Sequence, residues 1–322
     1  MKLSNLKPVV TAIGSHNSVG ASIEIQAALY GETGAAWNRE LSKLQRFLFD
    51  GVPRFSILAI GNVKLPFLAF STLPGVTCPG AGECLQFCYS YKAWRYPAAF
   101  ARQCQNTVLM QTYAGRELIR QAFADYARVL ARRAGRKAGV AVRAAGGTKS
   151  MAGRAAVNAE QLAGLVPATT EFRLYVDGDF ADVGQVAFWQ GLLKANKWLN
   201  AYGYSKSFKE LLDYSGTLAP NYTLNISSGH AHDSLTVSRV EARLAATRGH
   251  FIAVTTPTKW RQADYGSRAY NAELVATHKA NTGRKAFPCP GRCGECRTVK
   301  GKNSHACGDK ALTGVDIIIA MH

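Results

Sequence analysis

The sequence lacks long hydrophobic runs and tracts of low complexity. No apolar run approaches the ~20 residues that a membrane-spanning helix needs. The apolar stretch near the N-terminus is short and interrupted by polar residues, so we expect no signal peptide. These absences favour a globular cytoplasmic protein with no membrane partner, and they leave its oligomeric state open.

The sequence is also poor in acidic residues. It contains 21 Asp and Glu against 39 Lys and Arg, which gives a formal net charge of +18 at pH 7. So strong a positive field attracts polyanions, and nucleic acid is the most common polyanion inside cells. We therefore expect DNA or RNA as partner or substrate; a basic surface that only maintains solubility is the alternative. One group of cations has helical spacing: Arg128, Arg132, Arg133, Arg136 and Lys137.

Short β-rich runs alternate with helical patterns along most of the chain. Such alternation is typical of a parallel sheet with helical crossovers, so we predict an α/β fold. A full or partial (β/α) barrel is the first interpretation, and a doubly wound open sheet is the second. Strands are expected at 54–62, 139–147, 171–179, 199–207, 221–229, 250–258 and 315–322, and the run 65–71 is a candidate for an eighth. Helices are expected at 21–31, 38–51, 106–135, 158–166, 182–197, 208–216 and 234–249.

The chain shows no clear domain boundary. We interpret residues 1–50 as an N-terminal helical extension and residues 51–322 as a single barrel-like domain with a C-terminal metal-binding loop. The stretch 144–157 (AAGGTKSMAGRAAV) is the most linker-like, and we expect it to be a flexible loop after a strand.

Polar residues recur at the carboxyl ends of the expected strands, where a parallel barrel carries its chemistry. Singly, each is explained as a helix cap or a turn residue, but together they predict a site at one edge. Gly178 separates two aspartates and indicates a close backbone approach or an unusual turn. The candidates for catalysis are Asp177, Asp179, Tyr204 and Lys206, and those for cofactor binding are Ser227, Ser228 and His322.

Seven of the eight cysteines fall in two tight groups about 200 residues apart. The N-terminal group is Cys78-x5-Cys84-x3-Cys88, and the C-terminal group is Cys289-x3-Cys293-x2-Cys296-x10-Cys307. Thiolates at such spacings can converge on one ion or cluster, and a reducing compartment favours metal ligation over disulfides. We therefore expect all seven to be metal ligands, whereas the isolated Cys104 is expected to pack in a core.

The N-terminal cysteine loop follows an expected strand and precedes a long helix. In this position it resembles the loop of radical S-adenosylmethionine enzymes, whose three cysteines hold a four-iron cluster with one iron open to the cofactor. Their usual pattern is Cys-x3-Cys-x2-Cys, whereas Tyr91 occupies the third position here and Cys78 would supply the third thiolate. The C-terminal group does contain that pattern, but its added fourth cysteine is more typical of structural zinc or an auxiliary cluster.

Several segments together resemble the gene-product-88 family of phage and plasmid proteins. They are TCPGAGECLQFCYSYKAWRYP, the Arg102-x3-Asn106 pair, YVDGDFAD, NAYGYSKS and the C-terminal cysteine segment with its closing strand. The resemblance extends from about residue 54 to 322 and leaves residues 1–50 outside. It implies a radical-SAM-like barrel with cysteine-bound metal, encoded on mobile DNA.

Two functions follow as competing hypotheses. The first is an iron–sulfur (4Fe-4S) protein of a mobile element, with S-adenosylmethionine as a further candidate cofactor, acting on nucleic acid or nucleotides. The second is a non-catalytic nucleic-acid-binding protein of plasmid or phage maintenance, in which zinc or a cluster only staples the loops. A zinc hydrolase is a weaker third interpretation, because the sequence has no His-Glu-x2-His segment.

Overall fold

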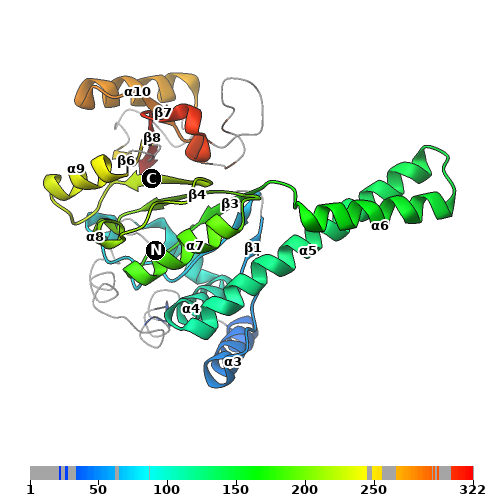
Figure 1. Ribbon diagram of the computed structural model, residues 1–322. Coiled ribbons are helices and arrows are strands. Elements are labelled where there is room, and N and C mark those ends of the chain that lie inside the picture. Colours follow the sequence, from blue (N-terminus) through cyan, green and yellow to red (C-terminus); the bar gives the residue numbers. More distant parts are fainter. Residues whose placement is uncertain are drawn as a thin grey trace.

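The computed structural model describes residues 22, 26–27, 34–61, 65–86, 88–244, 249–255, 266–291, 293, 296 and 306–321. These residues form a mixed α/β fold around one eight-stranded sheet (Figure 1). The strands are β1 (Ala59–Ile60), β2 (Leu68–Ala69), β3 (Thr170–Leu174), β4 (Leu199–Ser205), β5 (Tyr222–Ser227), β6 (Gly249–Thr255), β7 (Ala286–Pro288) and β8 (Asp316–Met321).

The strands follow one another in the order β1-β2-β3-β4-β5-β6-β8-β7. The β1–β2 pair is antiparallel and every other pair is parallel, so the carboxyl ends of β3, β4, β5 and β6 share one edge. The predicted α/β class is confirmed. The described strands do not form a closed barrel, because β1 and β7 each pair with a single neighbour and stand at the two ends of the order.

Eight described α-helices accompany the sheet. None of them is both long and apolar enough to cross a membrane. They are α3 (Gly34–Asp50), α4 (Pro97–Gln111), α5 (Tyr113–Ala144), α6 (Lys149–Leu165), α7 (Val183–Ala195), α8 (Phe208–Asp213), α9 (Ser234–Arg243) and α10 (Arg268–Thr282).

Aromatic side chains form the centre of the main core. The Trp189 ring on α7 lies 4.8 Å from the Phe70 ring and 5.9 Å from Phe172 of β3. Phe123, from the first half of α5, packs edge-on against Phe172 at 5.1 Å. All four side chains are almost fully buried, so this cluster holds α5 and α7 against the sheet. Cys104 is also fully buried in this core, as predicted.

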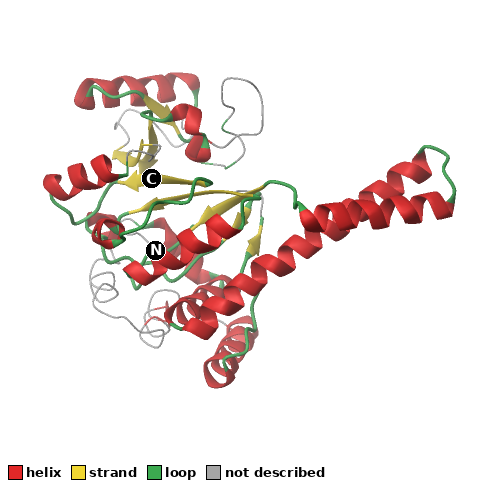
Figure 2. Ribbon diagram, viewed as in Figure 1, coloured by secondary structure: helices red, strands yellow, loops and turns green. Residues whose placement is uncertain are grey.

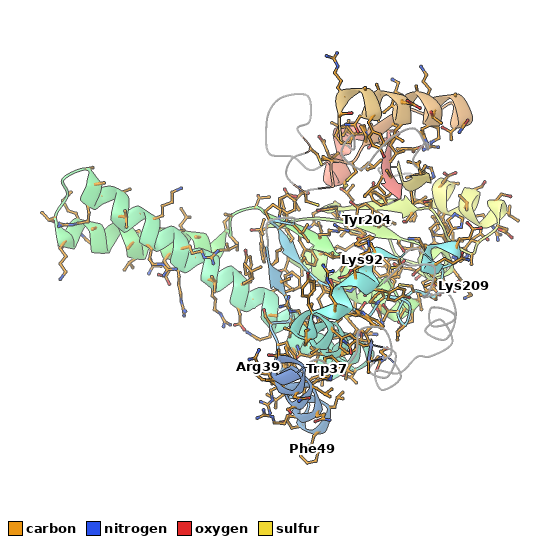
Figure 3. All side chains as sticks on the ribbon, turned by 180° about the vertical axis from the view of Figure 1, so that it is seen from behind. Trp37, Arg39, Phe49, Lys92, Tyr204 and Lys209 are labelled. Carbon is orange, nitrogen blue, oxygen red and sulfur yellow. The ribbon has the colours of Figure 1, made fainter. Side chains whose placement is uncertain are left out.

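Helix α3 belongs to the same core. It buries Trp37 and Phe47 on one side, and the Trp37 ring lies 5.9 Å from Phe100 of α4. Phe49 points the other way and is 94% exposed (Figure 3). The predicted helix at 38–51 is confirmed, and it is packed on the α/β domain. The predicted helix at 21–31 lies largely outside the described residues.

The prediction for residues 139–157 is wrong. Residues 139–144 of the expected strand at 139–147 continue α5, and most of the expected loop at 144–157 is the start of α6 (Figure 2). Small residues explain the difference, because they let the two helices approach closely. A Cβ added at Gly135 would meet the Ala156 carbonyl oxygen at 2.7 Å, and one at Gly139 would meet that of Ala152 at 3.2 Å.

Other differences concern short or broken elements. The expected helix at 106–135 is divided into α4 and α5 at Thr112, whose side chain caps α5 by accepting a hydrogen bond from Gly115 N at 3.0 Å. Strand β7 and helix α10 were not predicted from the sequence.

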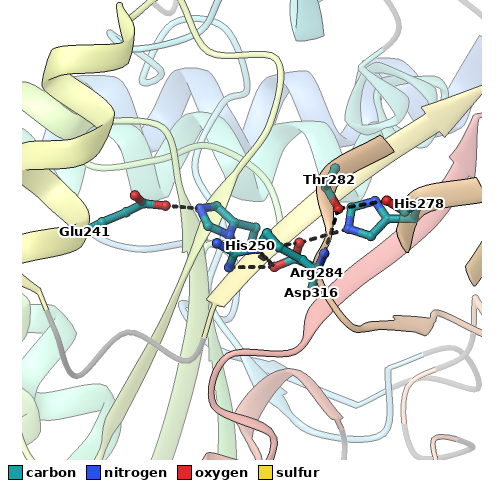
Figure 4. Close-up of polar contacts among 6 residues, drawn as sticks. All are labelled: Glu241, His250, His278, Thr282, Arg284 and Asp316. Atoms are coloured by element: carbon teal, nitrogen blue, oxygen red, sulfur yellow. Dashed lines mark hydrogen bonds and ion pairs between the residues drawn. The ribbon is translucent and has the colours of Figure 1, made fainter. Parts of the chain in front are cut away.

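A buried ion network joins the amino ends of β6 and β8 to α10 and the turn that follows it (Figure 4). The Asp316 carboxylate, fully buried at the start of β8, contacts His250 at 3.1 Å and His278 at 2.9 Å. Arg284 Nε donates to it at 2.9 Å. Burial would raise the pKa of Asp316, but the hydrogen bonds from His250, Arg284 and His278 lower it far below the ordinary range.

Candidate cysteine-lined site

The N-terminal cysteine loop is docked on the carboxyl ends of the strands. Gly82 N and Cys84 N both donate to the carbonyl oxygen of Gly229, at 3.0 and 3.1 Å, shortly after β5. Ala231 N donates in return to Gly80 O at 3.0 Å. These backbone hydrogen bonds fix the loop at the edge where the sequence predicted a site.

Glycines make this close docking possible. A Cβ added at Gly80 would lie 1.7 Å from the Lys206 carbonyl oxygen, and one at Gly82 would lie 2.7 Å from the His230 carbonyl carbon. Gly229 has a φ of +74°, and its added Cβ would meet Cys84 Cβ at 2.9 Å. Any side chain at these positions would push the loop away from the sheet.

The loop and the strand ends enclose a cavity of about 120 Å³. All three N-terminal cysteines line it, together with all four residues predicted as catalytic. A second cavity, of about 340 Å³, shares Gly75, Cys78, Ala81 and Leu85 with the first. The predicted residues that line the first cavity are Cys78, Cys84, Cys88, Asp177, Asp179, Tyr204, Lys206 and Ser227.

Asp179 organises the end of β4. Its Oδ1 accepts hydrogen bonds from Ser205 Oγ and Phe180 N, both at 2.8 Å, and its Oδ2 accepts one from Lys206 N at 2.6 Å. Burial raises the pKa of this carboxyl, against the effect of these hydrogen bonds. Lys206 Nζ then donates to Ser227 Oγ at 2.8 Å. Asp179 thus accepts three hydrogen bonds and positions Lys206.

Asp177 is the second buried carboxylate of the cavity, and Ser90, Ser71 and Gln103 donate hydrogen bonds to it. Gln103 Nε2 donates to its Oδ2 at 2.9 Å, and burial raises its pKa above the ordinary value. Gly178 between the two aspartates has a φ of +82°, and a Cβ there would lie 2.0 Å from Thr72 Oγ1. The unusual turn predicted at Gly178 is therefore confirmed.

Ser228, another residue predicted to bind a cofactor, is not among the residues that line this cavity. Ser228 Oγ accepts a hydrogen bond from Ala253 N at 3.0 Å and so joins the end of β5 to β6. His322 lies outside the described residues.

The N-terminal thiols share a buried environment. Burial raises the pKa of Cys78 and of Cys84, and it raises the pKa of Cys88 to about 11. The thiols also raise one another's pKa, as Cys88 does for Cys78 and Cys84 does for Cys88. A cation is the natural counter-charge for a set of thiolates in such a place.

The C-terminal cysteines form a second group against the same sheet. Cys296 and Cys307 are buried with Tyr202, and Cys289 packs against them. Burial raises the pKa of Cys307 to about 12, and the neighbouring Cys289 and Cys296 contribute to the rise. Burial also raises the pKa of Cys289 to about 11, with contributions from Cys296 and Cys293. Cys289, Cys296 and Cys307 thus belong to one cluster, and Cys293 acts electrostatically on Cys289.

Arg173 and Tyr204 connect the two cysteine groups. Both line the N-terminal cavity, and the guanidinium lies over the Tyr204 ring at 4.9 Å. Arg173 Nη1 is 3.9 Å from Cys293 Sγ, and the Tyr204 hydroxyl donates to the Cys307 thiol. Arg173 was not predicted from the sequence, because an arginine between the buried Phe172 and Leu174 matches the ordinary alternation of side chains along a strand.

The thiols line their cavity without converging on one point. Among the residues that the structure describes, no three His, Cys, Asp or Glu side chains are arranged to hold a single metal ion. An iron–sulfur cluster needs a different ligand arrangement, because each cysteine binds a different iron atom and the thiolates surround the whole cluster. The three soft donors around one cavity fit that need in their chemistry.

These features define a class of protein: an α/β protein with a cysteine-lined cavity at the carboxyl edge of a parallel sheet. The profile of the Gene product 88 family matches residues 36–310, and the chain belongs to this family. The match begins inside α3, so it includes most of a helix that the sequence resemblance left outside. No curated protein and no solved structure matches the chain.

Proposed function

We propose that this protein is an iron–sulfur enzyme, with a partial (β/α) barrel of the radical S-adenosylmethionine type and a nucleic acid or nucleotide as substrate. The observation that carries the proposal is the cavity shared by Cys78, Cys84 and Cys88 with Lys206 and Ser227. Strands β2 to β6 are parallel and in chain order, which supports a partial barrel.

The three cysteines would hold a four-iron cluster and leave one iron open toward the cavity. Such a cluster supplies single electrons to a bound cofactor. Lys206 is suited to bind a carboxylate or phosphate of that cofactor or of the substrate, because its ammonium donates to a neutral hydroxyl, Ser227 Oγ. Asp177, with its raised pKa, is suited to accept a ribose hydroxyl or to exchange a proton.

The C-terminal group supports a second, structural role for metal. Four thiolates would complete the tetrahedral shell of one zinc ion, although no three of them converge on one point in the described structure. An ion bound there would join the loops that follow β7 and precede β8. A protein with zinc at this group alone would be a stapled, non-catalytic protein of phage or plasmid maintenance. A zinc ion at the C-terminal group is also compatible with an iron–sulfur cluster at the N-terminal group.

Anaerobic purification, a visible spectrum and quantification of iron, sulfide and zinc would test the proposal. We expect a brown protein with about 4 iron and 4 sulfide ions per chain, and we expect both to be lost in Cys84→Ala and in Cys88→Ala. Cys104→Ala is the matched control, because it removes a thiol that lies outside both groups. A colourless wild type containing only zinc would refute the iron–sulfur assignment.

A further inference from the structure

We propose that the α5–α6 hairpin is an arm that binds the phosphate backbone of a duplex nucleic acid. The hairpin extends away from the body of the molecule, and only the first half of α5 packs on the core (Figures 1 and 2). The proposal deepens the nucleic-acid part of the proposed function, and it is independent of what the cysteine-lined cavity binds.

The outer part of the arm carries charge of one sign. Residues 127–159 contain eight Lys and Arg and no Asp or Glu. The net charge of the whole chain is +18. Every one of the eight is exposed. They are Arg128, Arg132, Arg133, Arg136, Lys137, Arg143, Lys149 and Arg154.

Most of these cations are free of carboxylate partners. Arg128 forms an ion pair with Asp125 at 2.7 Å, and Arg143 Nη1 donates to Gly147 O at 2.9 Å. No other ion pair involves the eight residues within the described chain, and residues 113–165 are all described. Surface cations of a globular protein are usually interspersed with acids, so this concentration favours an external anionic partner.

The cations of α5 form a regular row. Arg128, Arg132 and Arg136 are four residues apart, so they share one face and follow one another at about 6 Å along the axis. Arg143 returns to the same face, which gives a row about 22 Å long. Helix α6 packs beside this row, because the buried Ala131 and Gly135 lie three residues after Arg128 and Arg132 and so on an adjoining part of the α5 surface. The four arginines of the row are all exposed, on a helix that α6 supports.

The composition of the arm indicates which polyanion it fits. Single-stranded nucleic acid is usually bound by aromatic side chains on which bases stack, and residues 127–159 contain no aromatic residue. A membrane-surface helix needs a bulky apolar face, whereas the large exposed apolar residues of this segment are only Val140, Met151 and Val157. A rigid row of cations suits the regular backbone of a duplex.

Fluorescence anisotropy with the full-length protein would test the arm. The probes are one labelled sequence of ~25 bp as duplex DNA, as duplex RNA and as a single strand, in a series of salt concentrations. The arm variant carries R132Q, R136Q, R143Q and K149Q. We expect at least about tenfold weaker binding to a duplex, and a smaller slope of log K against log salt, by up to about 3.6 if all four contact phosphates.

The control variant removes the same charge elsewhere. K194Q, K197Q, R239Q and K279Q are all exposed and lie on α7, after α7, on α9 and on α10. If the arm is the site, this variant binds within about twofold of wild type, because long-range fields are screened at ~0.15 M salt. Equal loss in both variants would overturn the proposal, as would no duplex binding by wild type at low salt.

A shortened arm and two cysteine variants separate this proposal from the previous one. Replacing residues 136–155 by a short glycine-rich turn removes the outer arm beyond the Gly135–Ala156 contact, and it is expected to weaken duplex binding at least as much. Stronger binding to the single strand, or to vesicles with anionic headgroups, would overturn the proposal. The variants C84A and C88A should retain duplex affinity, and the arm variant should retain its iron, so the two proposals can fail separately.

Discussion

Replacing Asp179 by asparagine should destabilise the site without changing its size. The amide oxygen of the new side chain can still accept from Ser205 Oγ and Phe180 N, but its NH₂ group would then face Lys206 N, a donor that lies 2.6 Å from Oδ2 in the wild type. A charge-assisted bond is lost and a buried donor is left unsatisfied, which costs about 2–4 kcal/mol. An entropy of unfolding of about 2.1 cal/mol/K per residue converts this to a fall in Tm of about 3–6 °C.

Urea denaturation and differential scanning calorimetry, both on anaerobic protein, would measure this loss. The matched control is Asp213→Asn, the same change at an exposed ion pair with Lys209, which should cost at most about 1 kcal/mol. If the Asp179 variant unfolds at the same urea concentration as wild type, then Asp179 does not organise the end of β4 as described.

Three further outcomes are expected. Gly80→Ala should reduce iron and sulfide content several-fold, because the new Cβ would overlap the Lys206 carbonyl oxygen; Gly153→Ala, where nothing lies within 4 Å, should leave that content unchanged. Asp316 has a folded pKa below its unfolded value near ~3.9, so its contribution is fully present above that pH and is lost progressively as the pH falls toward the folded pKa. The difference in urea midpoint between wild type and Asp316→Asn should therefore be larger at about pH 6 than at about pH 3, and a constant difference would contradict this assignment. Trp189→Ala should cost about 3–5 kcal/mol in unfolding free energy, since the ring is fully buried among aromatic neighbours; a loss below ~1 kcal/mol would mean that this cluster does not anchor α7.

The sheet was predictable where strands are long and strongly patterned. Runs such as EFRLYVDGD and NYTLNISSG contain β-branched and aromatic residues, and they correspond to β3 and β5. The three-residue β7 carries too little pattern to be recognised. Val140 and Val142 gave a strand-like pattern, but helix packing through Gly135 and Gly139 decided the conformation there.

The location of the candidate site was predictable from the types of residue at the strand ends and in the cysteine loop. Polar residues at successive parallel strand ends must meet at one edge, and the cysteine spacing identified the loop that covers them. The participation of Arg173 depends on how far its side chain reaches across the sheet, which local sequence does not encode. The same holds for Ser228, whose hydroxyl is used by the neighbouring strand β6.

The segment between β7 and β8 is an unusual connection between two neighbouring parallel strands. Parallel neighbours are ordinarily connected by a crossover helix that packs on the sheet. Here the connection carries Cys289, Cys293, Cys296 and Cys307 and, in its described part, only two short 3₁₀ turns. With metal on those thiols, the attachment of the outermost strand would depend on ligand chemistry instead of helix packing. Chelators or oxidants would then loosen this edge of the sheet first, before the aromatic core around α7 responds.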